Sequence, residues 1–159
     1  MSVELFRIDD RLIHGQVVVG WGQTLGVTFL VLVDDEVRAS EWEQELYRMG
    51  VPHEVSVTFA SVEEAAARLA SWQRDEHRGI VLTGDVGTMA RLCAATGTAV
   101  RKVNVGGVHY RDGRKERLRY VYLNDAEAET LRALASAGVE VTAQDVPTGT
   151  RVPLAEFAA

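Results

Sequence analysis

The chain has 159 residues, which is enough for one domain with its own hydrophobic core and short for two. Hydrophobic residues make up 47% and charged residues 25%, as is typical of soluble globular proteins. The formal net charge of −6 gives no reason to expect nucleic acids or anionic membranes as partners.

The first informative stretch joins a predicted buried strand to a predicted helix. The residues after Gly15 show apolar positions at i, i+3 and i+7, the spacing of one helix face. His14 therefore lies at the start of that helix, where backbone N–H groups and the positive end of the helix dipole favour an anion. We expect the amides of Gly15, Gln16 and Val17 to bind this anion, and Gly15 to allow a close approach to the backbone.

His14 and its neighbours form the candidate catalytic group. An imidazole can accept a phosphoryl group at a ring nitrogen, and Arg11 offers a planar fork of donors for phosphate oxygens. His14 would then be the nucleophile and Arg11 the phosphate clamp. Asp9 or Asp10 would accept a hydrogen bond from the other ring nitrogen and orient the ring, and the sequence does not decide between them. A capping or packing role for His14 is the alternative.

The rest of the chain alternates predicted strands with predicted helices. Ser40, Ser61, Asp85 and Asn124 have the character of helix N-caps. Further strands are predicted at residues 27–33, 53–59, 79–82, 100–105, 120–123 and 139–144.

Two apolar features of the helices are interpreted as core. Trp42, Leu46 and Met49 repeat at helical spacing in the helix after Ser40, and we expect Trp42 to pack in the interior. Cys93 falls on the apolar face of a later helix and is interpreted as a small core residue. As the only cysteine, it excludes an internal disulfide and a zinc site built from several thiolates.

Several strands end in polar or glycine residues. In open α/β sheets, ligands bind at the carboxyl ends of the strands. Candidate residues to line such a crevice are Asp10, Asp34, Thr83, Gly84 and Gly106. The alternative is structural, with Asp34 capping the next helix and the others forming plain turns.

The last third of the chain contains a basic segment and a tail. Residues 108–119 carry Arg and Lys side chains around Asp112 and Gly113, which predicts a solvated hairpin with its turn there. A docking surface for an acidic partner is the alternative. Pro147, Gly149 and Pro153 predict an extended tail.

One string of residues carries a specific resemblance. R-I-D-D-R-L-I-H-G-Q-V, at residues 7–17, closely resembles the phosphorylation-site segment of the IIB component of the mannose/fructose/sorbose family of the sugar phosphotransferase system. Segments similar to the matching family segments follow in the same order at 31–37, 103–110 and 134–147. The likeness therefore covers effectively the whole chain.

The resemblance implies a fold. Strands that alternate with helices already predict an α/β chain with an open, mostly parallel sheet and helices on both faces. The family adds a three-layer α/β/α arrangement of about six strands, with the first strand interior and an extra antiparallel strand or hairpin near residues 108–123. The loop that carries His14 would then fall near a topological switch point.

The resemblance also implies a function for residues 1–159 as a single IIB phosphocarrier domain. His14 would accept a phosphoryl group on Nδ1 from the phosphohistidine of a IIA protein and pass it to a hexose transported by the membrane subunits IIC and IID. No metal or cofactor is expected. The chain would be a cytoplasmic phosphotransferase, peripherally associated with the transporter, and the likeness suggests a homodimer. No apolar run is long enough to span a bilayer.

Two other functions compete with transport. A regulatory or orphan protein would keep the phosphorylatable histidine without serving a transporter. A metal-independent enzyme would hold a small phosphorylated metabolite with Arg11 and use His14 as general acid or base. The sequence leaves the sugar and the oligomeric state open.

Overall fold

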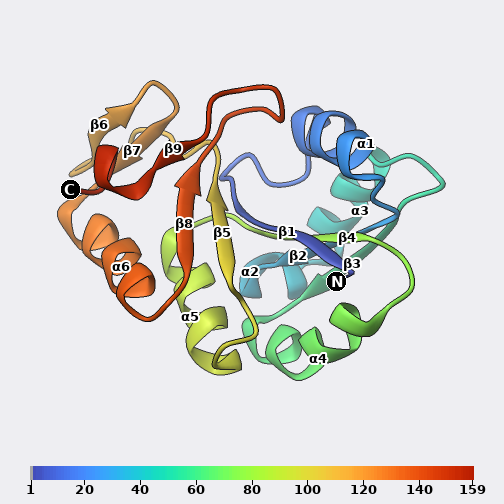
Figure 1. The fold of residues 1–159 in the computed structure, drawn as a ribbon. Helices are drawn as coiled ribbons and strands as arrows, with labels where there is room; N and C mark the ends of the chain where they lie inside the picture. The colour runs from blue at the N-terminus through green and yellow to red at the C-terminus, as the bar shows by residue number, and fades with distance from the viewer. Residues whose placement is uncertain (1) are drawn as a thin grey trace.

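The computed structural model describes residues 2–159 apart from the side chain of Gln16. Its main sheet has the strand order β3-β2-β4-β1-β5-β8-β9. All neighbours in it pair in parallel except β8 and β9 (Figure 1). Its strands are β1 (Val3–Ile8), β2 (Phe29–Val33), β3 (Ser56–Ala60), β4 (Gly79–Thr83), β5 (Lys102–Val105), β8 (Glu140–Ala143) and β9 (Val152–Pro153). The predicted α/β fold and the interior first strand are confirmed.

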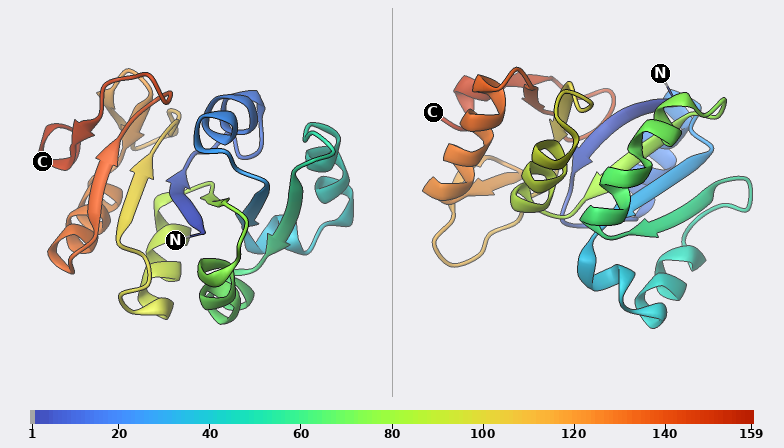
Figure 2. Two further views of the ribbon diagram at one scale, coloured as in Figure 1. Left: turned by 45° about the vertical axis from the view of Figure 1, so that its right-hand side comes forward. Right: turned by 90° about the horizontal axis from the view of Figure 1, so that it is seen from below.

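Helices cover both faces of the sheet (Figures 1 and 2). One face carries the π-helix η1 (Gln16–Trp21), which continues into α1 (Gly22–Leu25), together with α2 (Asp35–Arg38) and α3 (Glu41–Met49). The other carries α4 (Val62–Arg74), α5 (Val86–Thr96) and α6 (Asp125–Ser136). These are the three expected layers. None of the described helices is long and apolar enough to cross a membrane.

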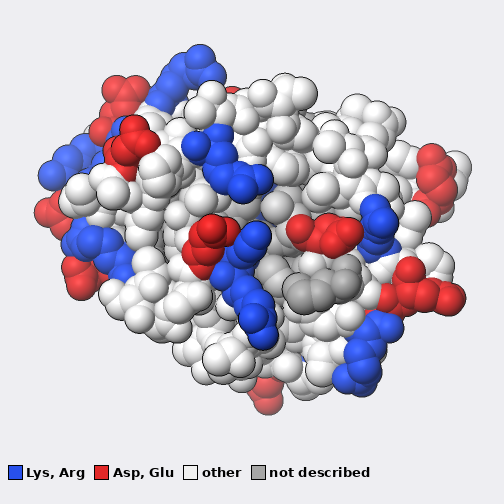
Figure 3. Space-filling view, viewed as in Figure 1, with Lys and Arg blue, Asp and Glu red and all other residues white. Residues whose placement is uncertain are grey.

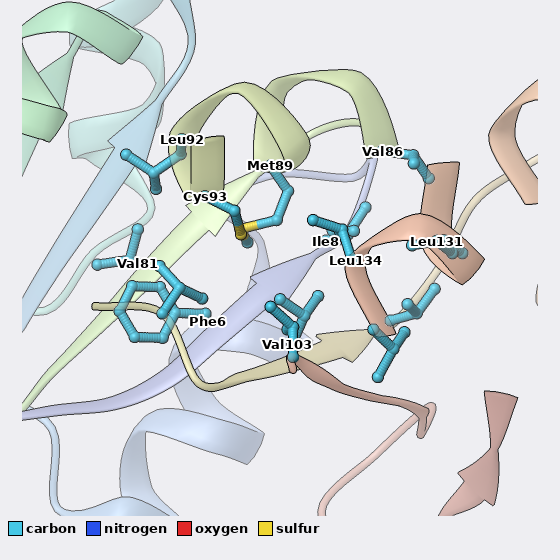
Figure 4. Packing of buried hydrophobic residues seen from close by; sticks show 14 of the residues in the cluster. Phe6, Ile8, Val81, Val86, Met89, Leu92, Cys93, Val103, Leu131 and Leu134 are labelled. Carbon is cyan, nitrogen blue, oxygen red and sulfur yellow. The ribbon is translucent and has the colours of Figure 1, made fainter. Parts of the chain in front are cut away.

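The larger core lies between the sheet and helices α4 to α6. In Figure 4, side chains of α5 and α6 such as Met89, Leu92 and Leu131 gather above the strands that carry Ile8 and Val81. All five are fully buried. Burial of apolar side chains on this face therefore anchors β1, whose end carries the loop of interest.

Cys93 belongs to this core. Its side chain is buried, and burial raises the pKa of the thiol to about 11. The interpretation of Cys93 as a packing residue is confirmed, because a buried thiol with a raised pKa is a poor nucleophile.

The predicted helix caps are confirmed. The side chains of Ser40, Ser61, Asp85 and Asn124 each accept a hydrogen bond from the backbone N–H three residues later. Ser61 and Asn124 form complete capping boxes with the glutamates at those positions. Local polar chemistry thus fixes where α3, α4, α5 and α6 begin.

The prediction that Trp42 packs in the core is wrong. Trp42 is 72% exposed, Leu46 50% and Met49 82%. The helix packs instead through its opposite side, where the Tyr47 ring approaches Phe59 with 6.4 Å between ring centroids. The apolar spacing indicated a real helix face, but that face points outward.

The hairpin prediction needs one correction. The segment forms a separate antiparallel pair, β6 (Lys115–Leu118) and β7 (Val121–Leu123), so an extra hairpin is present. Its turn lies at residues 119–120, whereas Asp112 and Gly113 form an earlier turn that leads into β6. Gly113 has a φ of 88°, which explains the glycine there.

The C-terminal tail was predicted to be extended, but it contains regular structure. Val152 and Pro153 form β9, which pairs antiparallel with β8, and a short 3-10 helix, η2 (Leu154–Glu156), follows. Phe157 and Ala158 are buried in the larger core. The sheet thus has seven strands, where about six were expected.

The two tryptophans offer a matched test of this packing. Trp72 is 6% exposed and Trp42 is 72% exposed. We expect Trp72→Ala to lower the free energy of unfolding by about 3–5 kcal/mol, because it leaves a cavity in the core. We expect Trp42→Ala to change it by about 0.5 kcal/mol or less. Denaturant unfolding of both variants measures this difference, and equal losses would contradict the packing described.

Candidate active site

The candidate site lies on the loop that leaves the carboxyl end of β1. The connection after β1 runs over one face of the sheet, whereas those after its neighbours β4 and β5 lead to helices on the other face. Such a reversal opens a crevice at the strand ends. Backbone hydrogen bonds tie the loop to both neighbours, from Asp9 N to Thr83 O (2.9 Å) and from Asp10 N to Gly107 O (2.8 Å).

A buried arginine lies beneath the loop. Arg7 on β1 is 0% exposed. Its guanidinium donates to the Asn104 side chain of β5, to Gln144 O (2.9 Å) and to Asp145 O (2.9 Å). Burial lowers the pKa of Arg7, an effect that the charge of Asp9 opposes. The cation thus joins β1 to β5 and to the end of β8.

Asp9 is held between two guanidiniums. Its Oδ2 accepts hydrogen bonds from Arg7 Nη2 (3.1 Å) and Arg11 Nη2 (2.8 Å), and its Oδ1 accepts from Arg11 Nε (2.9 Å) and from the Arg11 backbone N–H (3.1 Å). Burial would raise the pKa of Asp9, but the hydrogen bonds from Arg11 and both positive charges lower it overall. Asp9 is therefore a carboxylate at neutral pH.

Two glycines make room for this network. A Cβ atom on Gly106 would lie 2.1 Å from Arg7 Nη2 and 2.7 Å from Asp9 Oδ2. A Cβ on Gly107 would lie 3.0 Å from Arg11 Nε. The glycine pair after β5 thus allows a close approach of this chain's own charged side chains, and Gly106 is itself buried.

His14 lies beside this network. Its Nε2 is 3.9 Å from Asp9 Oδ2, and its side chain is 24% exposed, against 30% for Arg11. Burial lowers the pKa of the imidazole, the charge of Arg11 lowers it further, and Asp9 opposes both. A partly buried imidazole that is neutral near pH 7 can act as a nucleophile.

The geometry separates the two candidate carboxylates. Asp9 lies beside His14, whereas Asp10 binds His109, accepting from its backbone N–H (2.7 Å) and contacting its Nδ1 (2.6 Å). Asp10 thereby fastens the loop to the segment after β5. Leu12, which lies between Asp10 and His14 in the chain, has a φ of 59°, which is strained for a leucine.

The residues predicted to bind an anion through their backbone amides differ in their surroundings. Gly15 is exposed, and no atom lies within 4 Å of where its Cβ would be. The prediction that the Val17 N–H binds the anion is wrong, because this N–H donates to His14 O at 3.1 Å. The side chain of Gln16 lies outside the described part of the chain.

The other predicted lining residues lie at the strand ends in different settings. Asp34 caps α2 through Val37 N (2.9 Å), the structural alternative foreseen for it. Thr83 is fully buried, and Gly84 lies under Leu12, whose Cδ2 would be 2.8 Å from a Cβ there. Among the described residues, no group of three or more His, Cys, Asp or Glu side chains could hold a metal ion.

Sequence reasoning did not single out Arg7, Asn104 or His109. A signal existed for Arg7, because it is a charged residue within an apolar interior strand, where a buried charge requires partners. Asn104 pairs with Arg7 in the register of β1 and β5. His109 lies close to Asp10 through tertiary structure alone, 99 residues away in the chain.

Comparison with known proteins gives a consistent result. A family model matches residues 3–159. It describes the sorbose subfamily IIB component of the sugar phosphotransferase system (PTS). The N-acetylgalactosamine-specific phosphotransferase enzyme IIB component 1 of Escherichia coli is 34% identical and covers 92% of each chain. The sorbose-specific EIIB component of Klebsiella pneumoniae is 33% identical over 89% of this chain and 85% of its own.

A solved structure agrees with this relationship. The IIB domain of the sorbose permease from Klebsiella pneumoniae superposes with a TM-score of 0.88 at 27% identity, covering 98% of this chain and 96% of that one. IIB components are phosphotransferases that accept a phosphoryl group from a IIA protein and pass it to a sugar, with the membrane subunits IIC and IID as further partners. The chain belongs to the sorbose subfamily of PTS IIB components.

Proposed function

We propose that His14 is the residue of this IIB component that carries the phosphoryl group, within a single domain that spans residues 1–159. The observation that supports this most is the position of a partly exposed imidazole 3.9 Å from Asp9, which two guanidiniums hold in place. The same carboxylate binds Arg11, so the nucleophile and the proposed phosphate clamp share one anchor.

The reaction follows from the ring nitrogens. Nε2 faces the carboxylate of Asp9, which favours a proton on Nε2 and an electron pair on Nδ1. Nδ1 attacks the phosphorus of the donor phosphohistidine, so that a new P–N bond forms while the donor's P–N bond breaks and its ring nitrogen keeps the electron pair. A sugar hydroxyl later attacks the same phosphorus and loses its proton to solvent, while the P–N bond of His14 breaks and its electron pair returns to Nδ1.

Arg11 and the backbone supply the charge stabilisation. Nε and Nη2 of Arg11 bind Asp9, so Nη1 is the guanidinium nitrogen that Asp9 does not use. The guanidinium and the amides of Gly15 and Gln16 would stabilise the transferring group. Asp10, Asp34, Thr83, Gly84 and Gly106 stay predicted lining residues. The missing side chain of Gly106 leaves the space that Arg7 and Asp9 occupy.

The family match favours transport over the two competing functions. We place the protein on the cytoplasmic side, peripherally associated with IIC and IID, because it transfers a phosphoryl group to a sugar that they carry. A homodimer stays a prediction. A chain that acts on a free metabolite would turn it over without a protein donor, which gives a direct contrast in the assay.

Loss of the nucleophile is the first test. We expect phosphorylated IIA to transfer a radiolabelled phosphoryl group to the wild type and to leave His14→Ala unlabelled, because the accepting nitrogen is gone. His77→Ala is the matched control, since His77 is an exposed histidine on another loop, and it should label as the wild type does. Equal labelling of His14→Ala and the wild type would end the proposal.

The pH dependence is the second test. We expect His14 to titrate below the usual histidine pKa of about 6.5, so that phosphoryl acceptance persists to lower pH than for an ordinary imidazole. Arg11→Gln should raise the pKa of His14, because it removes a positive charge and leaves Asp9 less neutralised. NMR titration of the ring measures both shifts. A His14 pKa that is unchanged or lower in Arg11→Gln would contradict the described electrostatics.

A further inference from the structure

An apolar stripe faces outward on α3. Trp42, Leu46 and Met49 lie at i, i+4 and i+7, so they share one side of the helix, and all three are exposed. No residue of α3 is buried. Large exposed apolar side chains grouped on one helix face are typical of an interaction surface, and tryptophan and methionine are enriched at such surfaces.

Acidic side chains flank the stripe. Glu41 and Glu45 are exposed on the same helix, and no ion pair in the described part of the chain involves them or Glu43. Residues 34–49 carry six acidic and two basic side chains, in a chain whose net charge is −6. A net charge of −4 therefore lies in the segment that forms α2 and α3.

The opposite end of the molecule carries charges of both signs. Figure 3 shows Lys and Arg side chains gathered near the β6–β7 hairpin, with acidic ones among them. Figure 2 shows α3 at the end away from α6 and the C-terminus. The acidic, apolar face of α3 is thus far from the mixed-charge end that carries the β6–β7 hairpin.

We propose that the outward face of α3, formed by Trp42, Leu46 and Met49 with Glu41 and Glu45, docks on the membrane subunits. This inference rests on the proposed function. Loops on the cytoplasmic side of membrane proteins are rich in Lys and Arg, so we expect IIC and IID to present a cationic surface that complements the glutamates. A lipid surface is the wrong partner, because the cytoplasmic leaflet is itself negative and repels an acidic helix.

The position of α3 is compatible with simultaneous transfer at His14. The helix packs on edge strand β3, and β3 lies three strand spacings, roughly 14 Å, from β1. The outward face of α3 and the loop of His14 are therefore separate parts of the surface. Docking through a separate surface leaves the imidazole accessible to IIA in one step and to the sugar in the next.

The test measures the two transfer steps separately with the full chain. Inverted membrane vesicles that contain IIC and IID are supplied with sugar and with increasing amounts of the phosphorylated protein. For Trp42→Ala we expect the protein concentration at half-maximal sugar phosphorylation to rise about tenfold or more, since buried tryptophans dominate interface affinity. The rate at saturation and the labelling by phosphorylated IIA should not change.

A charge-reversed variant tests the electrostatic part. Glu41→Lys combined with Glu45→Lys should also raise the half-maximal concentration and weaken its dependence on salt, because the attraction from the two glutamates is lost. Glu156→Lys is the matched control, since Glu156 is exposed near the C-terminus, and it should match the wild type.

Four outcomes decide the proposal. The results above support it, whereas an unchanged half-maximal concentration in Trp42→Ala overturns it. Slower labelling of Trp42→Ala by IIA assigns the stripe to the donor, and loss of a wild-type dimer in Trp42→Ala assigns it to a second copy; either overturns it too. Labelling of the wild type by phosphorylated IIA is measured before the vesicle assay. Its failure would overturn the proposed function itself.

Discussion

The structure of the site depends on one buried carboxylate between two guanidiniums. Asp9 and Arg7 are 0% exposed, and neither charge could remain in the interior without the other. Removal of one member of such a buried pair typically costs about 3–5 kcal/mol, since it strands the other charge. Arg11 completes the arrangement from the partly exposed side. The ionic network therefore determines where the loop lies, and the loop determines where His14 lies.

Other features follow from this network. Gly106 and Gly107 leave space that Arg7, Asp9 and Arg11 occupy, and the Trp21 ring lies 4.9 Å from the guanidinium carbon of Arg7. The strained Leu12 persists because Asp9 and Asp10 bind backbone on either side of β1. An ionic network that holds the loop in place, with a partly exposed imidazole on that loop, suits a phosphoryl carrier. Such a carrier must hold a reactive group in a fixed orientation and yet release it.

The fold and the centre of the site could be predicted where the signal is local. Capping residues such as Ser61 and Asn124 set helix starts through neighbouring backbone groups, and the apolar strands were recognisable from composition. What could not be predicted depends on tertiary packing. Periodicity finds a helix face but not its direction, so Trp42 was placed inside. The choice between Asp9 and Asp10 required His109, which is distant in sequence.

The central claim is that Asp9 orients His14 so that Nδ1 is the ring nitrogen that accepts the phosphoryl group. NMR of the phosphorylated protein with isotope-labelled histidine tests this directly, because nitrogen–phosphorus coupling identifies the phosphorylated nitrogen. We expect phosphate on Nδ1 and a proton on Nε2, facing Asp9. Phosphate on Nε2 would contradict it, since it would put two negative groups in the place where the structure has an attractive pair.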